Sequence, residues 1–169
     1  MSKVLAKLLA ASLLLAATAL PATSLPATSA ATGQPAPDFA LKNLAGDNFR
    51  LSEWRGEVVL LTFWAEWCAQ CTAELQALET LQLQHQGDGV RVVAVNIDRK
   101  SRPFRDASSS LKLLVLHDSD QFVARQYALS DLPLTVLVDA YGKVRYVHQK
   151  YRGGDTILYA EELTALLVE

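Results

Sequence analysis

The sequence has few of the residues from which structural disulfides and zinc sites are built. Its 169 residues include two cysteines and three histidines. Both cysteines lie in the motif Trp67-Cys68-Ala69-Gln70-Cys71, and the sequence contains no third cysteine that could pair with either of them. A bridge across so short a loop removes little entropy from the unfolded chain, which argues against a purely structural disulfide. The two cysteines therefore react with each other or with a group outside the chain.

The histidines are too scattered to complete a metal site, although C-x-x-C is itself a spacing of metal ligands. A four-ligand zinc site needs two further ligands, and His85, His117 and His148 do not have the spacing of a zinc motif. Half of a zinc or copper site, or a pair of inert buried thiols, remain alternatives to redox chemistry. We expect no metal and no other cofactor.

The sequence also has no excess of positive charge. Sixteen Lys and Arg residues against 18 Asp and Glu residues give a net charge of −2. Loss of the two lysines nearest the N-terminus, Lys3 and Lys7, changes the balance to 14 against 18, or −4. Without a basic patch, nucleic acid is not an expected partner.

The N-terminal region has the layout of a secretory signal. Lys3 and Lys7 form a basic start, Leu8–Leu20 is an apolar core, and small residues follow. The apolar core is shorter than the roughly 20 residues of a membrane span. An uncleaved membrane anchor is the alternative, whereas a lipoprotein anchor is excluded because no cysteine lies near the cleavage region. We therefore predict a protein of the periplasm or cell envelope, in contact with the membrane only if the signal stays uncleaved.

This layout divides the chain into three parts. Residues 1–30 are the predicted signal peptide, with cleavage after Ala19 or near Ala30. Residues 31–37 are a predicted linker. Residues 38–169 are enough for a single domain with one core.

The residues around the cysteines predict a strand followed by a helix. Val58–Trp64 is a short, unbroken apolar run, typical of a strand buried on both faces. Cys71 begins an apolar stripe at helical spacing that continues with Leu75 and Leu78. Cys68 consequently lies at the start of the helix, where unpaired N–H groups and the helix dipole favour a thiolate. On this placement Cys68 attacks a disulfide, and Cys71 resolves the mixed disulfide that forms.

The rest of the domain predicts a mixed sheet with helices on both faces. A second apolar run at Val90–Ile97 completes a β-α-β unit with parallel strands and a right-handed crossover. Two hairpins are expected, an N-terminal one (Phe39–Leu41 with Asn48–Leu51) and a later one (Leu134–Val138 with Val144–His148). Between them we expect a helix within Asp98–Ser110, a strand at Leu111–Leu116, and a helix at Gln121–Tyr127 that is capped by the cluster His117–Asp120. The last expected helix is capped by Asp155 or Thr156 and ends near Val168.

These residues resemble a known fold. The segment Phe63–Cys71, followed some sixty residues later by Asp131-Leu132-Pro133-Leu134-Thr135 and a hairpin, is similar to the thioredoxin fold. The N-terminal elements and the export signal make the chain more similar to the TlpA/ResA-like branch, bacterial thiol-disulfide oxidoreductases of the cell envelope. The resemblance extends from about Pro37 to the C-terminus. It implies an α/β thioredoxin-like fold with a mixed central sheet, helices on both faces and an added N-terminal β-hairpin.

The resemblance also implies roles for individual residues. Cys68 is then the attacking cysteine and Cys71 the resolving one. The Leu132–Pro133 bond is expected to be cis and to lie beside the dithiol, where the backbone of Leu132 pairs with an extended substrate strand. An ordinary proline at the start of a strand is the alternative. Trp67 is expected to be a partly exposed cover over the sulfurs that contacts the substrate.

Glu74 matches an acid that ResA-like members carry near the dithiol, which implies a proton carrier for Cys71. A solvated glutamate on the helix surface is the alternative. Thr62 stands where cytosolic thioredoxins have a buried acid, so that position supplies no carboxyl here. Two residues depart from the family pattern, namely Gln70, where proline is common, and Leu134, where threonine is common.

The function that we predict is exchange of a Cys68/Cys71 dithiol or disulfide with cysteines of envelope proteins. We expect the protein to be a monomer that acts as a reductant, supplied by an upstream membrane electron donor. The resemblance implies cytochrome c maturation as one pathway. The alternatives are a disulfide isomerase or oxidant, a non-catalytic interaction domain, and a copper-handling module of the same fold that adds His117 or His148 as a ligand.

Overall fold

The structure, a computed structural model, describes residues 30–169. Residues 1–29 of the predicted signal peptide, including the cleavage site after Ala19, lie outside the described residues. The elements, in chain order, are β1 (Ala40–Asn43), β2 (Asn48–Arg50), the 3-10 helix η1 (Leu51–Trp54), β3 (Val58–Trp64), α1 (Ala69–Gln84), β4 (Val90–Asn96), α2 (Ser101–Ser108), β5 (Leu114–His117), α3 (Phe122–Gln126), β6 (Leu134–Val138), β7 (Val144–Gln149) and α4 (Asp155–Leu167).

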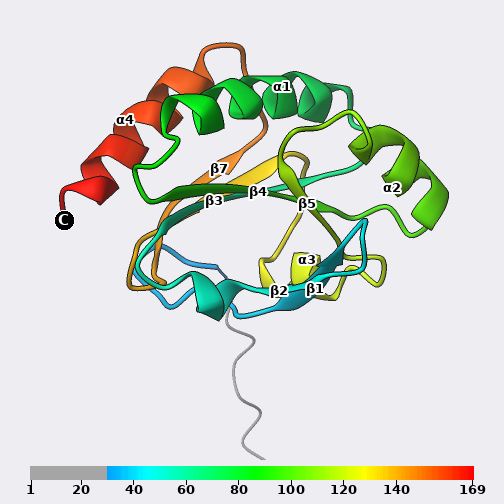
Figure 1. Cartoon of the computed structure of the whole chain (residues 1–169), viewed down its shortest axis with the longest axis horizontal. Coiled ribbons are helices and arrows are strands. Elements are labelled where there is room, and N and C mark those ends of the chain that lie inside the picture. The colour runs from blue at the N-terminus through cyan, green and yellow to red at the C-terminus, as the bar shows by residue number, and fades with distance from the viewer. Residues whose placement is uncertain (1–29) are drawn as a thin grey trace, which may run out of the picture.

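The described strands form one seven-stranded mixed sheet in the order β2-β1-β5-β4-β3-β6-β7. The three central strands β3, β4 and β5 are parallel, whereas β6 and β7 continue the sheet beside β3 in antiparallel pairing. The N-terminal hairpin β1–β2 extends the other side of the sheet beyond β5. Figure 1 shows α1, α2 and α4 on one face of the sheet and α3 on the opposite face. The predicted mixed sheet with an added N-terminal hairpin is confirmed.

Strand β3 lies at the centre of this architecture. All of its residues are buried, and successive side chains enter opposite core layers because a strand alternates its faces. Leu60 belongs to the core layer of α1 and α4, and Leu61 belongs to the layer on the α3 side. Thr62 is two residues beyond Leu60 and therefore points toward α1. This parity places the Thr62 hydroxyl in the core layer under α1.

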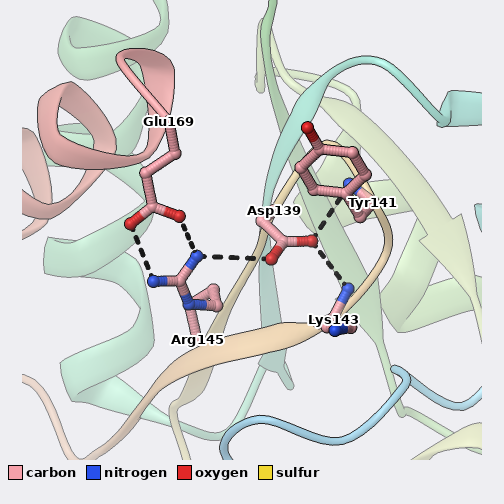
Figure 2. Close-up of polar contacts among 5 residues, drawn as sticks. All are labelled: Asp139, Tyr141, Lys143, Arg145 and Glu169. Carbon is pink, nitrogen blue, oxygen red and sulfur yellow. Dashed lines mark hydrogen bonds and ion pairs between the residues drawn. The ribbon is translucent and has the colours of Figure 1, made fainter.

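The carboxylate of Asp139 stabilises the turn of the hairpin β6–β7, and Arg145 links this hairpin to the C-terminal residue Glu169 (Figure 2). Asp139 accepts hydrogen bonds from the backbone N–H groups of Tyr141 and Lys143 across the turn, at 3.0 and 2.9 Å. Arg145 forms ion pairs with both Asp139 and Glu169, the residue that follows α4. The C-terminal end of α4 is thereby attached to β7.

The structure explains why β5 and α4 begin at different residues from those expected. The strand predicted at Leu111–Leu116 begins at Leu114, because the backbone N–H of Lys112 donates to the side chain of Glu79 on α1 rather than to a neighbouring strand. Helix α4 has Gly154 at its N-cap, with a φ of 112° that favours glycine. The expected cap Asp155 is instead the first helical residue.

The capping role predicted for the polar cluster before α3 is confirmed for Asp118. Its two carboxylate oxygens accept hydrogen bonds from the backbone N–H groups of Phe122 and Ala124, at 2.9 and 2.8 Å. These are first-turn donors that have no partner within the helix. Asp118 therefore fixes the start of α3, the short helix beside the cysteine motif.

Residues of the expected linker contact the domain. The backbone of Gly33 donates to the carbonyl of Val144 at 2.7 Å, and Pro35 forms a β-bridge with Lys143. The Tyr127 hydroxyl donates to the carbonyl of Pro37 at 2.9 Å. Across residues 30–169, no helix is long and apolar enough to cross a bilayer.

Candidate active site

The two cysteines lie where β3 leads into α1. Cys68 occupies the N-cap position of α1, and its sulfur accepts a hydrogen bond from the backbone N–H of Cys71 at 3.2 Å. The two residues form a disulfide, with their Cα atoms 5.3 Å apart. Cys68 retains 8% exposure, whereas Cys71 has none. The predicted placement at the helix start is confirmed, and an incoming group can reach the sulfur of Cys68 only.

A groove of about 500 Å³ opens beside the sulfur of Cys68. One side is lined by residues of the cysteine motif, including Trp67 and Gln70, and the opposite side by residues of α3 and the loop before β6, including Arg125 and Leu132. The Trp67 side chain is 70% exposed. The groove thus brings the cysteine motif and the expected substrate-binding loop together.

The Leu132–Pro133 peptide bond is cis, as the resemblance implied. Pro133 immediately precedes β6, and its carbonyl accepts a hydrogen bond from the backbone N–H of Lys150 at 2.9 Å. Leu132 lies in the groove together with Cys68. Of the expected substrate-binding residues, Trp67 and Leu132 are therefore brought to the disulfide from two different parts of the chain.

Glu74 is fully buried, so the alternative of a solvated glutamate on the helix surface is excluded. Its carboxyl is surrounded by three hydroxyl groups, at 2.8 Å from Thr62, 2.6 Å from Thr135 and 3.1 Å from Tyr159. Burial raises the pKa of Glu74, and the hydrogen bonds from the three hydroxyls lower it in part. The net result is a carboxyl group whose pKa lies above its ordinary value.

Four elements build this cluster. Glu74 comes from α1, Thr62 from β3, Thr135 from β6 and Tyr159 from α4. Thr62 and Thr135 are directly opposite each other in the antiparallel register of β3 and β6. The carboxyl of Glu74 therefore contacts the side chain of Thr62. Thr62 stands at the position where, by the resemblance, cytosolic thioredoxins have a buried acid.

Sequence reasoning did not identify Thr135, Tyr159 or Asp98 as members of the site. Asp98 follows β4 and accepts hydrogen bonds from the backbone of Glu66 and the side chain of Asn96, at 2.9 and 2.8 Å. It holds the loop that carries the cysteine motif. A polar residue at the carboxyl end of a parallel strand is the signal that predicts Asp98, and the strand pairing predicts Thr135 once Thr62 is singled out. No local signal marks Tyr159.

The two histidines considered as copper ligands have other partners. His117 Nε2 lies 2.7 Å from the carbonyl oxygen of Asp98, and His148 Nε2 lies 2.7 Å from a carboxylate oxygen of Glu162. Within the part of the chain that the structure describes, no group of three or more His, Cys, Asp or Glu side chains is arranged to hold a metal ion.

Comparisons with known proteins agree with this geometry. The AhpC/TSA family model matches residues 32–147. The thiol-disulfide oxidoreductase ResA of Geobacillus thermodenitrificans is 35% identical over 120 residues, which are 69% of this chain and 68% of that protein. The thioredoxin-like protein YneN of Bacillus subtilis is 37% identical over 122 residues, 69% of this chain and 70% of that protein. A crystal structure from Chlorobium tepidum, provisionally assigned as a thiol:disulfide interchange protein DsbE, covers 82% of this chain and 99% of its own at 32% identity, with a TM-score of 0.78.

The chain is thus a member of the AhpC/TSA family, with a thioredoxin-like fold. Within this class it belongs to the TlpA/ResA-like branch, and it is a thiol-disulfide oxidoreductase. The predicted family, fold and class of enzyme are confirmed.

The raised pKa of Glu74 makes the stability of the disulfide form depend on pH. Above its ordinary pKa of 4.5, the folded state binds more protons at Glu74 than the unfolded state does. Stability is therefore highest below that pH and is lost as the pH rises through the folded pKa. We expect the free energy of unfolding of the wild type to fall by up to about 1.4 kcal/mol per pH unit relative to Glu74→Gln in this window.

Urea unfolding of both proteins between about pH 4 and pH 8 measures this difference. Gln is a suitable replacement because its amide keeps one oxygen acceptor and adds a donor toward Thr62. Stability curves that run parallel across this pH range would show that Glu74 titrates like an exposed carboxyl.

Proposed function

We propose that the protein reduces protein disulfides in the cell envelope, with Cys68 as the attacking and Cys71 as the resolving cysteine. The observation that carries this proposal is the difference between the two sulfurs. Cys68 lies at the groove, and Cys71 is fully buried behind it. A substrate sulfur consequently meets Cys68 first, and Cys71 acts only within the molecule.

The reaction is a pair of thiol-disulfide exchanges. In the dithiol form, the Cys68 thiolate attacks one sulfur of a substrate disulfide and releases the other as a thiolate. The Cys71 thiolate then attacks the Cys68 sulfur, breaks the mixed disulfide and releases the second substrate thiolate. Two electrons and the two dithiol protons pass to the substrate. The protein is left as the Cys68–Cys71 disulfide, and a dithiol donor must reduce it again.

The groove binds the substrate as an extended segment. Pro133 has no N–H group, so it leaves room for the incoming sulfur. The backbone of Leu132 pairs with the segment in the manner of an added strand. The exposed indole of Trp67 covers the same segment from the cysteine side.

Glu74 is the proton carrier for Cys71. Residues three apart on a helix are neighbours, and both side chains are fully buried, away from bulk water. Glu74 accepts the thiol proton when Cys71 attacks, and returns a proton when the disulfide is reduced. Its negative charge also disfavours a thiolate at Cys71, so the two groups titrate as a coupled pair.

The surroundings of the sulfurs support a reductant. Strong oxidants of this chemistry have a stabilised reduced form, in which the thiolate has a much lowered pKa. Here the donor to the Cys68 sulfur is the Cys71 N–H group of the same motif, and a buried acid lies one helical turn from Cys71. When this carboxyl is ionised, its negative charge destabilises a thiolate at Cys71 and thereby favours the disulfide.

The expected partners are cysteine-containing envelope proteins and a membrane electron donor, reached after export by the predicted N-terminal signal. Membership of the TlpA/ResA-like branch directs the proposal to apocytochrome c, whose cysteines must be reduced before haem attachment. The bonds that His117 and His148 form elsewhere in the domain favour this redox role over copper handling.

Replacing the resolving cysteine tests the order of attack. Cys71→Ser leaves the Cys68 thiolate able to form a mixed disulfide and removes the group that resolves it. We expect this variant to accumulate covalent complexes with envelope proteins that dissociate on treatment with dithiothreitol, as seen by non-reducing electrophoresis. Cys68→Ser is the matched control and should trap none. Equal trapping by both variants would reject the assigned order.

The reduction potential tests the direction of electron transfer. A thioredoxin-fold reductant lies toward the potential of thioredoxin, about −270 mV, whereas a strong oxidant lies near −120 mV. Equilibration with glutathione mixtures should give a value below about −200 mV for this protein. A potential near that of the strong oxidants would assign it to disulfide formation instead.

A further inference from the structure

The carboxyl of Glu74 takes part in a closed ring of hydrogen-bond contacts. Oε2 of Glu74 lies 2.8 Å from Thr62 Oγ1, which lies 3.1 Å from Thr135 Oγ1. Thr135 Oγ1 in turn lies 2.6 Å from Oε1 of Glu74. Tyr159 adds a further hydroxyl at 3.1 Å from Oε1. The ring closes because the two threonines face each other across β3 and β6.

The number of hydrogens shows which protonation state fits the ring. Each threonine hydroxyl has one hydrogen to donate, so an ionised Glu74 leaves two hydrogens for three ring contacts. Both threonines then donate to the carboxylate, and the contact between Thr62 and Thr135 has no hydrogen. A protonated Glu74 donates from Oε1 to Thr135, Thr135 donates to Thr62, and Thr62 donates to Oε2. Every contact of the ring then holds one hydrogen.

Burial and the surrounding charges favour the same state. Burial is the main cause that raises the pKa of Glu74. Among residues 30–169, no Lys, Arg or His nitrogen forms an ion pair with this carboxyl. The charged groups beside the cluster come from α4 and β7. Asp155 on α4 raises the pKa of Glu74 further. His148, which pairs with Glu162, lies beside Tyr159, and the centroids of the His148 and Tyr159 rings are 5.0 Å apart.

The hydroxyl of Tyr159 affects the pKa of Glu74. Burial and the neighbouring Glu74 raise the pKa of Tyr159, so its hydroxyl stays protonated and donates to Glu74 in both states of the carboxyl. A hydrogen bond to a charged acceptor is stronger than one to a neutral acceptor. Tyr159 therefore lowers the pKa of Glu74 and favours release of its proton.

We propose that Glu74, buried and closed into a hydrogen-bond ring with Thr62 and Thr135, is a neutral acid in the disulfide form, and that Tyr159 is a positioning residue that sets how readily this acid releases its proton. The inference rests on the proposed role of Glu74 as the proton carrier. When an incoming thiolate bonds to the Cys68 sulfur, the S–S bond breaks, and the Cys71 sulfur leaves with the electron pair. Glu74 gives its proton to that sulfur, and the threonine hydroxyls turn toward the new carboxylate. Tyr159 on α4 thereby affects proton transfer to Cys71 at the start of α1.

The experiment follows the protonated carboxyl group directly. Infrared difference spectra of the disulfide form contain a carboxylic C=O band from a protonated Glu74, which is identified by its absence in Glu74→Gln. We expect this band to be present in the wild type at neutral pH. In Tyr159→Phe, which removes only the hydroxyl, the pH at which the band disappears should rise by about one unit.

Tyr127→Phe is the matched control. Tyr127 is also a buried tyrosine, and its hydroxyl donates to the carbonyl of Pro37 rather than to a carboxyl. This control should leave the titration of the band unchanged. Absence of the band in the wild type at neutral pH would overturn the neutral acid. A shift in Tyr127→Phe as large as that in Tyr159→Phe would overturn the role of Tyr159.

Exchange rates separate this inference from the proposed function. If Glu74 carries the proton, Glu74→Gln should slow disulfide exchange at neutral pH by roughly 10²-fold, and Tyr159→Phe should move the pH dependence of the rate only when Glu74 is present. An unchanged rate in Glu74→Gln would reject Glu74 as the proton carrier, and with it the positioning role of Tyr159. The infrared band would still decide whether the carboxyl is neutral.

Discussion

The burial of a single carboxyl group connects the elements around the disulfide. A buried polar group must have hydrogen-bond partners, because leaving one such group unpaired costs about 1–3 kcal/mol. Glu74 on α1 finds its partners on β3, β6 and α4, so these elements have to keep their positions to within hydrogen-bond distance. The start of α1, which carries the disulfide, and the segment before β6, which carries Leu132 and Pro133, are therefore held on one frame. The groove between them is a consequence of that arrangement.

One turn of helix separates two chemically different sulfurs. Cys68, at the N-cap of α1, borders the groove, whereas Cys71 is fully buried, three residues before Glu74 on the same helix. The strand before the motif makes this division possible, because β3 is buried on both faces and ends at Trp64, a short loop before α1 begins at Ala69. The exposed sulfur suits intermolecular exchange. The buried sulfur exchanges its proton away from bulk water, and Glu74, one helical turn further on, is the proton carrier that we propose for it.

The sequence predicted the parts of the site that depend on local patterns. The apolar run before the motif, the helical spacing after it and the hairpin β6–β7 follow from residues close together in the chain, whereas the cis bond before Pro133 is implied by the family resemblance. The surroundings of Glu74 do not follow from local patterns, because its partners Thr62, Thr135 and Tyr159 are 12, 61 and 85 residues away. The helical period placed Glu74 on the same face as Cys71, but its charge equally fitted a solvated position. Only the packing of α1 against the sheet and α4 decides between the two. The start of β5 was likewise missed because the partner of Lys112 is a side chain on α1.

We propose that a proton passes between Glu74 and Cys71. The most direct measurement is the ¹³C NMR titration of the Glu74 side-chain carboxyl in both the disulfide and the dithiol form. In the disulfide form, we expect one transition with a midpoint above the ordinary value of 4.5. In the dithiol form, we expect a changed titration with a second step, because Glu74 and the Cys71 thiol then titrate as a coupled pair. A midpoint near the ordinary value, or the same titration in both redox states, would contradict this proposal.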